Sequence, residues 1–468
     1  MTPMMEQYLS LKSQYQDALL FYRMGDFYEL FFDDAFAAAE VLDIALTKRG
    51  KHQGEDIAMC GVPHHSAEGY LLTLIRKGFR VAVCEQMESP AEARKRSSKS
   101  VVKRDVVRLV TPGTLTEETL LEARQHNFLA SFVRMRSECA LAWVDISTGG
   151  LWVEQIPLVK LGPELARIKP SEMLVPETLY ENVVEIAEDL SCSLTPLSAS
   201  TFDSVSGDNR IKSLFRVETL DSFGQFERVE ISALGALIDY LDITQKGKLP
   251  LLKTPQRQFA SKIMQIDAAT RRNLEVTRTL SGARQGSLLS TIDRTVTASG
   301  ARLLEQRLSS PSLDVNEIKG RLDSIDDMCA DPGVCQDIRE MLRKVPDLER
   351  ALSRISLERG GPRDIGNIRS GLVQAQRIYD ALHRKHWSKH IRQSIDTLQG
   401  HEKLITLLEE ALVSEPPLLT RDGAFVAEGY NAELDEARLM RDEGRSVIAK
   451  IQGDYITLSG VQALKIKH

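Results

Sequence analysis

Apolar and polar residues follow two different periodicities along the chain. Before Ser232, short apolar runs of strand length alternate with amphipathic stretches, whereas after it long charged segments carry a 3.6-residue repeat interrupted by prolines. The first pattern is typical of sheets covered by helices, and the second of helices packed on one another. We therefore predict a multidomain protein in which mixed α/β units precede an all-α scaffold.

The first predicted unit, residues 1–112, combines strands and helices. Thr2 and Pro3 offer an N-cap and a first helical residue, so a helix is expected to begin there. Residues 18–24 form an apolar run that Gly25 ends, and residues 27–42 are predicted to be one helix. Further predicted elements are strands at 44–49, 80–85 and 101–110 and a helix at 67–77.

A second α/β unit is predicted for residues 125–230. Two strand-like runs at 139–146 and 151–155 flank the turn sequence Ser-Thr-Gly-Gly, which indicates a hairpin. Helical patterns at 159–168 and 178–190 enclose a short strand at 173–175. This alternation predicts a second sheet with helices packed against it.

After residue 230 the predicted structure is helical, except at the end of the chain. Residues 231–422 form the scaffold, and residues 423–468 form a further region whose main helix spans 431–451. Residues 461–468 alternate apolar and polar side chains as a strand does, without a following partner segment. The sequence is therefore expected to stop inside a domain.

Composition is consistent with a large globular protein. The 468 residues are 42% hydrophobic and 27% charged, and no apolar run approaches the ~20 residues of a membrane helix. The N-terminus lacks the layout of a signal peptide, so a cytoplasmic location is predicted. The net charge is -6, but residues 1–112 carry 15 Lys+Arg and 15 Asp+Glu, so the first unit is balanced. A nucleic-acid surface there would require local clustering of charge.

Several kinds of chemistry lack their sequence signatures. The phosphate-binding motif Gly-x-x-x-x-Gly-Lys-Ser/Thr, the zinc motif His-Glu-x-x-His and the nucleophile motif Gly-x-Ser-x-Gly are absent from the sequence. The six cysteines form no Cys-x-x-Cys pair, so we predict that they are small buried residues. Adjacent histidines in a strand point to opposite faces, so we predict that His64 and His65 have a structural role in a loop and do not share a metal. No catalytic, metal-binding or ATP-binding residue is predicted in this chain.

The segment from Arg23 to Asp33 holds an unusual concentration of aromatic and acidic residues. In a structural interpretation, Asp26 is a helix N-cap, Glu29 completes a capping box and Phe27 belongs to the core. In a functional interpretation, Phe27 is exposed on the first helical turn and wedges between bases, while Glu29 reaches a base edge. The residues alone leave both interpretations open.

The same segment resembles the MutS family of DNA mismatch-recognition proteins, whose Phe-x-Glu motif it contains as Phe27-Tyr28-Glu29. The resemblance extends over nearly the whole chain, and the matching motifs follow one another in the same order as in the family. The matching stretches are residues 2–8, 21–31, 46–50, 61–65, 83–86, 108–114, 271–275 and 322–325.

The resemblance implies an order of domains. It comprises a mixed α/β mismatch-binding domain (1–112), an α/β connector with an RNase H-like fold (125–230), a helical core with levers (231–422) and the start of a clamp domain (423–468). In the family a C-terminal ATPase and dimerisation domain follows, and the sequence is expected to stop before it. ATP, Mg²⁺, homodimerisation, a MutL-type partner and a bacterial, nucleoid-associated location are thus expectations for the full-length family, with no cofactor expected in this chain.

The resemblance also implies site residues. Phe27 and Glu29 are expected to contact the mismatch, and Met24, Arg49 and Pro63 match positions that line the DNA side of the family's first domain. Two basic runs are further candidates for phosphate contacts, with solvated surface charge as the alternative. They comprise Arg94, Lys95, Arg96, Lys99, Lys103 and Arg104, and on the last predicted helix Arg438, Arg441, Arg445 and Lys450.

The sequence leaves two alternative functions open. One is a relative of the same fold that binds branched or junction DNA without sensing mismatches, and such a relative is expected to lack the Phe-x-Glu pair. The other is an enzyme acting on nucleotides, which only the α/β units favour. Substitution of Phe27 separates mismatch recognition from ordinary binding to the DNA backbone.

Overall fold

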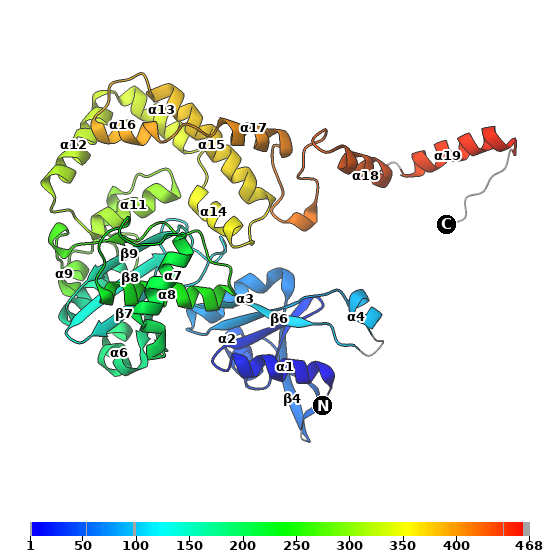
Figure 1. Ribbon diagram of the computed structural model, residues 1–468, viewed down its shortest axis with the longest axis horizontal. Coiled ribbons are helices and arrows are strands. Elements are labelled where there is room, and N and C mark those ends of the chain that lie inside the picture. Colours follow the sequence, from blue (N-terminus) through cyan, green and yellow to red (C-terminus); the bar gives the residue numbers. More distant parts are fainter. Residues whose placement is uncertain (1, 53, 97–99, 443, 462–468) are drawn as a thin grey trace.

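The computed structural model describes residues 2–52, 54–96, 100–442 and 444–461. Two α/β units lie next to each other at one end of the molecule, and a helical part arches away from them toward the C-terminal helices (Figure 1). The predicted combination of α/β units followed by an all-α region is confirmed. Among the described helices, none is both long and apolar enough to cross a membrane.

The first unit contains a six-stranded sheet with the order β3-β4-β2-β1-β5-β6 in the described residues. Helix α1 packs on one face through Met5 and Tyr8, and α2 and α3 pack on the other. The strands are β1 (Leu19–Met24), β2 (Phe27–Phe31), β3 (Thr47–His52), β4 (Glu55–Pro63), β5 (Val81–Gln86) and β6 (Arg104–Val110). The helices are α1 (Pro3–Gln14), α2 (Asp33–Leu42), η1 (His64–Ser66), α3 (Ala67–Arg76) and α4 (Pro90–Arg96).

The prediction of one helix over residues 27–42 is wrong in its first part. Residues Phe27–Phe31 are strand β2, which pairs with β1 on one side and β4 on the other, and α2 begins only at Asp33. Gly25 has a φ of +59° and forms with Asp26 a two-residue hairpin turn, a conformation that glycine adopts without strain. Asp26 is therefore a turn residue, not an N-cap, and no capping box forms at Glu29.

One smaller expectation about the first unit also changes. The strand predicted at 44–49 lies at Thr47–His52, displaced toward the tip of a long hairpin. His64 and His65, for which a structural role in a loop is predicted, begin a short 3₁₀ helix directly after β4. The predicted N-cap is confirmed, because the Thr2 hydroxyl accepts a hydrogen bond from the backbone N–H of Met5.

The second unit has a sheet with the order β11-β10-β7-β8-β9-β12 in the described residues. The predicted hairpin is confirmed as β8 and β9, which pair antiparallel. Helix α8 covers one face, and α5 and α6 cover the other. The strands are β7 (Leu129–Met135), β8 (Glu138–Asp145), β9 (Gly150–Gln155), β10 (Glu172–Pro176), β11 (Ser193–Leu197) and β12 (Gln256–Arg257). The helices are η2 (Leu158–Lys160), α5 (Leu161–Ile168), η3 (Glu177–Leu179), α6 (Tyr180–Asp189), η4 (Ala199–Phe202), α7 (Ser204–Phe215) and α8 (Arg228–Gln245).

The rest of the described chain is helical. Residues 432–442 and 444–451 of the helix predicted at 431–451 are helical, as α18 and the start of α19, and residue 443 between them lies outside the described residues. The strand predicted at 461–468 also lies outside the described residues except for Val461. The helices are η5 (Ala260–Lys262), α9 (Ala268–Asn273), α10 (Leu288–Ile292), α11 (Ala298–Ser309), α12 (Val315–Ala330), α13 (Pro332–Leu342), α14 (Leu348–Ser356), α15 (Pro362–Leu382), α16 (Lys389–Asp396), α17 (Glu402–Ala411), η6 (Thr420–Asp422), α18 (Ala432–Asp442) and α19 (Gly444–Ser459).

Buried polar groups join the α/β units to each other. The carboxylate of Glu172, on β10 in the second sheet, accepts hydrogen bonds from the backbone N–H of Gly113 and the hydroxyl of Thr111, which follow the first sheet. Tyr240 on α8 donates to the same carboxylate at 2.7 Å. Because a buried carboxylate is stable only with such donors, these bonds fix the connection between the units.

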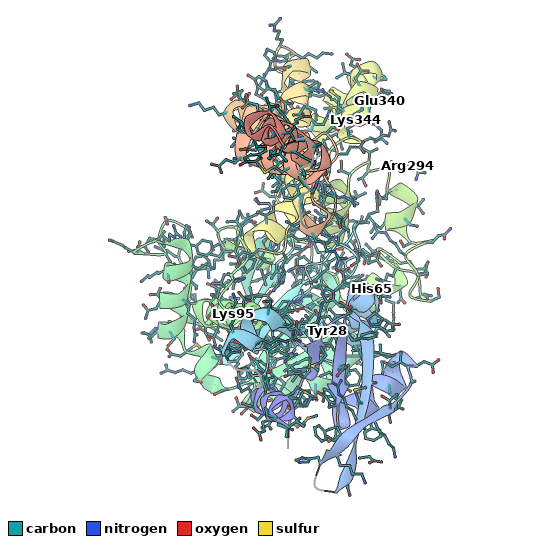
Figure 2. The ribbon with its side chains drawn as sticks, turned by 90° about the vertical axis from the view of Figure 1, so that its right-hand side faces the viewer. Tyr28, His65, Lys95, Arg294, Glu340 and Lys344 are labelled. Carbon is teal, nitrogen blue, oxygen red and sulfur yellow. The ribbon has the colours of Figure 1, made fainter. Side chains whose placement is uncertain are left out.

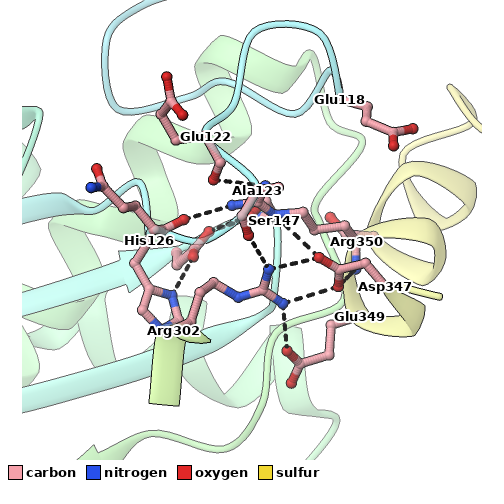
Figure 3. Close-up of polar contacts among 12 residues, drawn as sticks. Glu118, Glu122, Ala123, His126, Ser147, Arg302, Asp347, Glu349 and Arg350 are labelled. Atoms are coloured by element: carbon pink, nitrogen blue, oxygen red, sulfur yellow. Dashed lines mark hydrogen bonds and ion pairs between the residues drawn. The ribbon is translucent and has the colours of Figure 1, made fainter. Parts of the chain in front are cut away.

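Arginines from the helical part hold the segment that connects the two units. Arg302 on α11 donates to the carbonyl of Ala123 and pairs with Asp347 and Glu349 (Figure 3). Arg350 on α14 donates to the carbonyls of Glu122 and Gln125. Both arginines are almost completely buried, so this junction ties all three parts of the chain together.

An ion pair near this junction makes the stability of the junction dependent on pH. Arg124 in the connecting segment pairs with Asp293, which follows α10. Although burial alone favours the neutral form, hydrogen bonds from Arg124 and Thr295 lower the pKa of Asp293 to about 2. An unfolded aspartate has a pKa of about 3.9. The stabilisation is therefore present above pH 4 and is lost as the pH falls toward 2.

Asp293→Asn is expected to lower the free energy of unfolding by about 1 kcal/mol at pH 6, and by less at pH 3, since Arg124 is partly exposed to solvent. Urea unfolding at the two pH values measures this difference. An equal loss at both would show that the carboxylate charge contributes nothing.

Candidate nucleic-acid interface

Three of the predicted site residues form a row across the first sheet. Phe27 on β2 lies opposite Met24 on β1 and opposite Pro63 on β4. Directly opposed residues on neighbouring strands share one face of a sheet, so the three side chains are neighbours. Helix α1 covers only part of this face, and the Phe27 side chain remains 47% exposed.

The strand geometry of β2 places Glu29 on the same face as Phe27. Successive side chains of a strand alternate between faces, so residues two apart lie side by side. Tyr28 points to the opposite face, where it is buried and donates a hydrogen bond to Glu85. Burial and this bond raise the pKa of Tyr28, so it stays protonated at neutral pH. Strand alternation, not a helical turn, therefore presents Phe27 and Glu29 together.

Arg49 completes the group. Its guanidinium forms an ion pair with the carboxylate of Glu29, although the two residues are 20 positions apart on strands that do not pair directly. All five predicted site residues, Met24, Phe27, Glu29, Arg49 and Pro63, thus lie close together on one face of the first sheet.

The basic run after β5 is divided in the structure. Arg94 and Lys95 are exposed on α4, which lies on the side of the molecule facing the viewer in Figure 2. Arg96 instead pairs with Glu88. Arg94, Lys95 and the exposed Lys103 remain candidates for phosphate contacts, whereas Lys99 lies outside the described residues.

Arg104 has a role that the sequence did not indicate. Its guanidinium lies over the ring of Tyr22 at 4.9 Å, donates to the carbonyl of Arg23 at 2.6 Å and contacts the sulfur of Met24. Arg104 is therefore packed against the sheet beside Met24 and supports the row that contains Phe27. The sequence holds no local signal for this contact, because Tyr22 on β1 and Arg104 on β6 lie on strands separated by β5.

The basic residues of the C-terminal helices have local partners where they are described. Arg438 donates to the carbonyl of Val426 and pairs with Asp435, and Arg441 pairs with Asp442. Lys450 is exposed on α19, whereas the side chain of Arg445 lies outside the description. These helices therefore offer little unpaired positive charge in their described part.

The described cysteines and acidic residues show no metal-ligand arrangement. No group of three or more His, Cys, Asp or Glu side chains in the described ranges could hold a metal ion. Burial raises the pKa of the Cys60 thiol to about 11 and that of Cys84 to about 12, so both are neutral. The prediction of buried cysteines is confirmed for these two, Cys139 and Cys192, and is wrong for the exposed Cys329 and half-buried Cys335.

Comparison with known proteins identifies the family. Three successive family profiles match the chain: MutS domain I at residues 2–119, MutS domain II at 127–253 and MutS domain III at 269–457. The DNA mismatch repair protein MutS of Roseobacter denitrificans is 61% identical over 467 residues, which are 100% of this chain and 53% of that protein. The proteins of the same name from Ruegeria sp. strain TM1040 and Paracoccus denitrificans are each 60% identical, over 100% of this chain and 53% of their own length.

The chain thus spans about half the length of the curated relatives it matches. The three profiles occur in consecutive order and together match most of the chain, and the identity extends from one end of the chain to the other. On this evidence the chain belongs to the MutS family.

Proposed function

We propose that this chain recognises mismatched or looped-out bases in duplex DNA, as the first step of DNA mismatch repair. The observation that carries the proposal is the exposed Phe27 next to Glu29 on one face of the first sheet. An aromatic ring that is 47% exposed loses hydrophobic stabilisation in water, yet it is well suited to stack on a base. The name of the relatives, DNA mismatch repair protein MutS, supports the same function.

The proposed mechanism uses the weakness of a mispaired step. Such a step is less well stacked, so kinking and partial unstacking require less free energy there than at a matched step. Phe27 enters from the minor groove and stacks on one mispaired base, which is insensitive to base identity because every base has a π-face. Met24 and Pro63 border the ring and restrict its position.

Glu29 adds selectivity by a different route. An ionised carboxylate only accepts hydrogen bonds, so it binds a base edge that offers an N–H group. On matched DNA no such edge is free, and the carboxylate repels the nearby phosphates. Glu29 therefore penalises binding to matched DNA more than binding to a mismatch.

A competition experiment tests the function. The chain is incubated with a labelled duplex containing a G·T mismatch or one extra base, and matched duplex, the mismatched duplex and a four-way junction compete at fixed salt. Stronger competition by the mismatched duplex is expected. Equal competition by matched duplex, the absence of binding, or a preference for the junction would each overturn the proposal, and the last would favour a relative that binds branched DNA.

Glu29→Gln is expected to tighten binding to matched duplex by roughly two- to threefold, because Arg49 offsets part of the repulsion of about 1 kcal/mol that two unit charges 4 Å apart have in water. The preference for the mismatched duplex should shrink accordingly. Glu40→Gln on α2 makes the same change of charge at an exposed site on the other side of the sheet and should leave both affinities unchanged. Unchanged affinity of Glu29→Gln for matched duplex would contradict the role of the carboxylate.

Further proposals follow from the family alone. We propose that ATP and Mg²⁺ control DNA binding through the C-terminal ATPase domain of full-length family members, that the full-length protein is a homodimer, and that a MutL-type protein is its partner. The cytoplasm of a bacterium is the proposed location.

A further inference from the structure

Arg49 reaches Glu29 across an intervening strand. The sheet order β3-β4-β2 places β4 between the strands that carry the two residues. Neighbouring strands lie about 4.8 Å apart, so the backbones of β3 and β2 are separated by roughly twice that distance. Only a long side chain lying across the face of β4 can bridge this gap. Arginine has the necessary length, and its guanidinium meets the Glu29 carboxylate.

Two features of the strands favour this path. The pairing of β3 with β4 is irregular between Lys48 and Lys51, which removes Arg49 from the regular ladder and changes its direction. Gly61 on β4 lies directly opposite Glu29. A Cβ added there would begin 3.4 Å from the carbonyl oxygen of Tyr28, 3.7 Å from Glu29 Cγ and 3.9 Å from Phe27 Cδ1, which are ordinary contact distances, so the glycine leaves extra room beside Glu29 without being sterically required.

The resulting contact neutralises and orients the carboxylate. The Glu29 side chain is 14% exposed and that of Arg49 is 41% exposed, so the ion pair covers most of the carboxylate but leaves the guanidinium open to solvent. Arg49 also contacts the sulfur of Met59 at 3.9 Å, which holds the guanidinium against β4. Without Arg49, the charge of Glu29 would lie unscreened beside Phe27, where DNA is proposed to bind.

We propose that Arg49 is a positioning residue that limits the penalty which Glu29 places on matched DNA, and so moderates the preference for mismatched DNA, by neutralising and orienting the carboxylate rather than by binding a phosphate. The proposal rests on the proposed function. In a mismatched complex, a base N–H satisfies the carboxylate whether or not Arg49 is present. In a matched complex Arg49 is the only proposed partner for the carboxylate, so its loss leaves the full repulsion of the phosphates.

The test is a double-substitution cycle in the full 468-residue chain at fixed salt. In the wild-type background, Arg49→Ala should weaken binding to matched duplex about two- to fivefold more than binding to mismatched duplex, the range typical of a partly exposed ion pair. In the Glu29→Gln background, Arg49→Ala should weaken both equally. Arg49→Lys should restore the wild-type preference, because it keeps the charge, whereas Arg49→Gln should not.

Lys48→Ala is the matched control. It removes one positive charge from the same hairpin, but Lys48 pairs with Asp56 at 2.8 Å and not with Glu29. Its effect on the two duplexes should be equal. If Arg49→Ala behaved like Lys48→Ala in both backgrounds, Arg49 would be an ordinary phosphate-attracting cation and the proposal would be overturned. If the wild-type chain showed no preference at all, the proposed function itself would fail, which the same measurements distinguish.

Discussion

Phe27→Ala should weaken binding to mismatched duplex by roughly one to two orders of magnitude while changing the affinity for matched duplex little. Stacking of a base on an aromatic side chain is worth about 1 to 3 kcal/mol, and every 1.4 kcal/mol is a factor of ten in affinity. Matched DNA resists unstacking, so the ring contributes little to its binding. The preference for mismatched DNA should therefore almost disappear. Fluorescence anisotropy with both duplexes at the same salt concentration measures it.

The chain provides a matched control for this substitution. Phe36 on α2 is 56% exposed, even more than Phe27, but it lies on the helix that packs against the opposite face of the sheet. Phe36→Ala removes at least as much exposed aromatic surface and should leave the preference unchanged. The Phe27 substitution removes an exposed side chain, so thermal unfolding of the variant should match that of the wild type. An equal loss of affinity on both duplexes would mean that Phe27 contributes only general binding.

Arg302→Met should lower the free energy of unfolding by about 2 to 3 kcal/mol, less than the loss of about 3 to 5 kcal/mol for a fully buried ion pair, because Asp347 is 21% exposed and also contacts Arg350. The Arg302 side chain is only 2% exposed and holds Asp347 with distances of 2.6 and 2.9 Å. Methionine keeps much of the volume but leaves the Asp347 carboxylate and the carbonyl of Ala123 without this donor. The connecting segment between the two sheets should loosen at the same time.

Urea unfolding and hydrogen exchange test this prediction. Amides of residues 121–126 should exchange faster in Arg302→Met, whereas Arg343→Met, at an exposed arginine after α13, should leave both observables unchanged.

The same ion pair should make the stability depend on pH. Burial opposes ionisation of Asp347, but the hydrogen bond and charge of Arg302 lower its pKa overall. The pair therefore stabilises the fold above the pKa of an unfolded aspartate and less at lower pH, and this acid-dependent part should be absent in the variant. A loss below 1 kcal/mol would show that water replaces Arg302.

The class of structure and the Phe-x-Glu motif can be predicted from local patterns along the chain. Hydrophobic periodicity separates the α/β part from the helical part because it reports burial on one side of each element, a local property. The hairpin of β8 and β9 was predictable for the same reason, since its turn residues and alternating strands are adjacent in sequence. Phe27-Tyr28-Glu29 was recognisable as a candidate site from its resemblance to the MutS family.

The secondary structure around the motif differs from the prediction, because local patterns do not distinguish a strand from a helix here. The apolar residues of the run from Phe27 to Phe31 are compatible with either periodicity, and Gly25-Asp26 fits both a hairpin turn and the start of a helix. The hydrogen bonds that β2 forms with β1 and β4 favour the strand, and β4 begins 24 residues after β2 ends. Such non-local pairing leaves no signal in a short window of sequence.

The assembly of the site depends on contacts between strands that are distant in the sequence. The row of Met24, Phe27 and Pro63, the support of Arg104 and the ion pair of Arg49 with Glu29 all join residues on different strands. Register and strand order determine these contacts, and both depend on packing of the whole sheet rather than on the residues next to each position. The same reason explains why the buried arginines at the junction of the three parts could not be distinguished beforehand from surface charge.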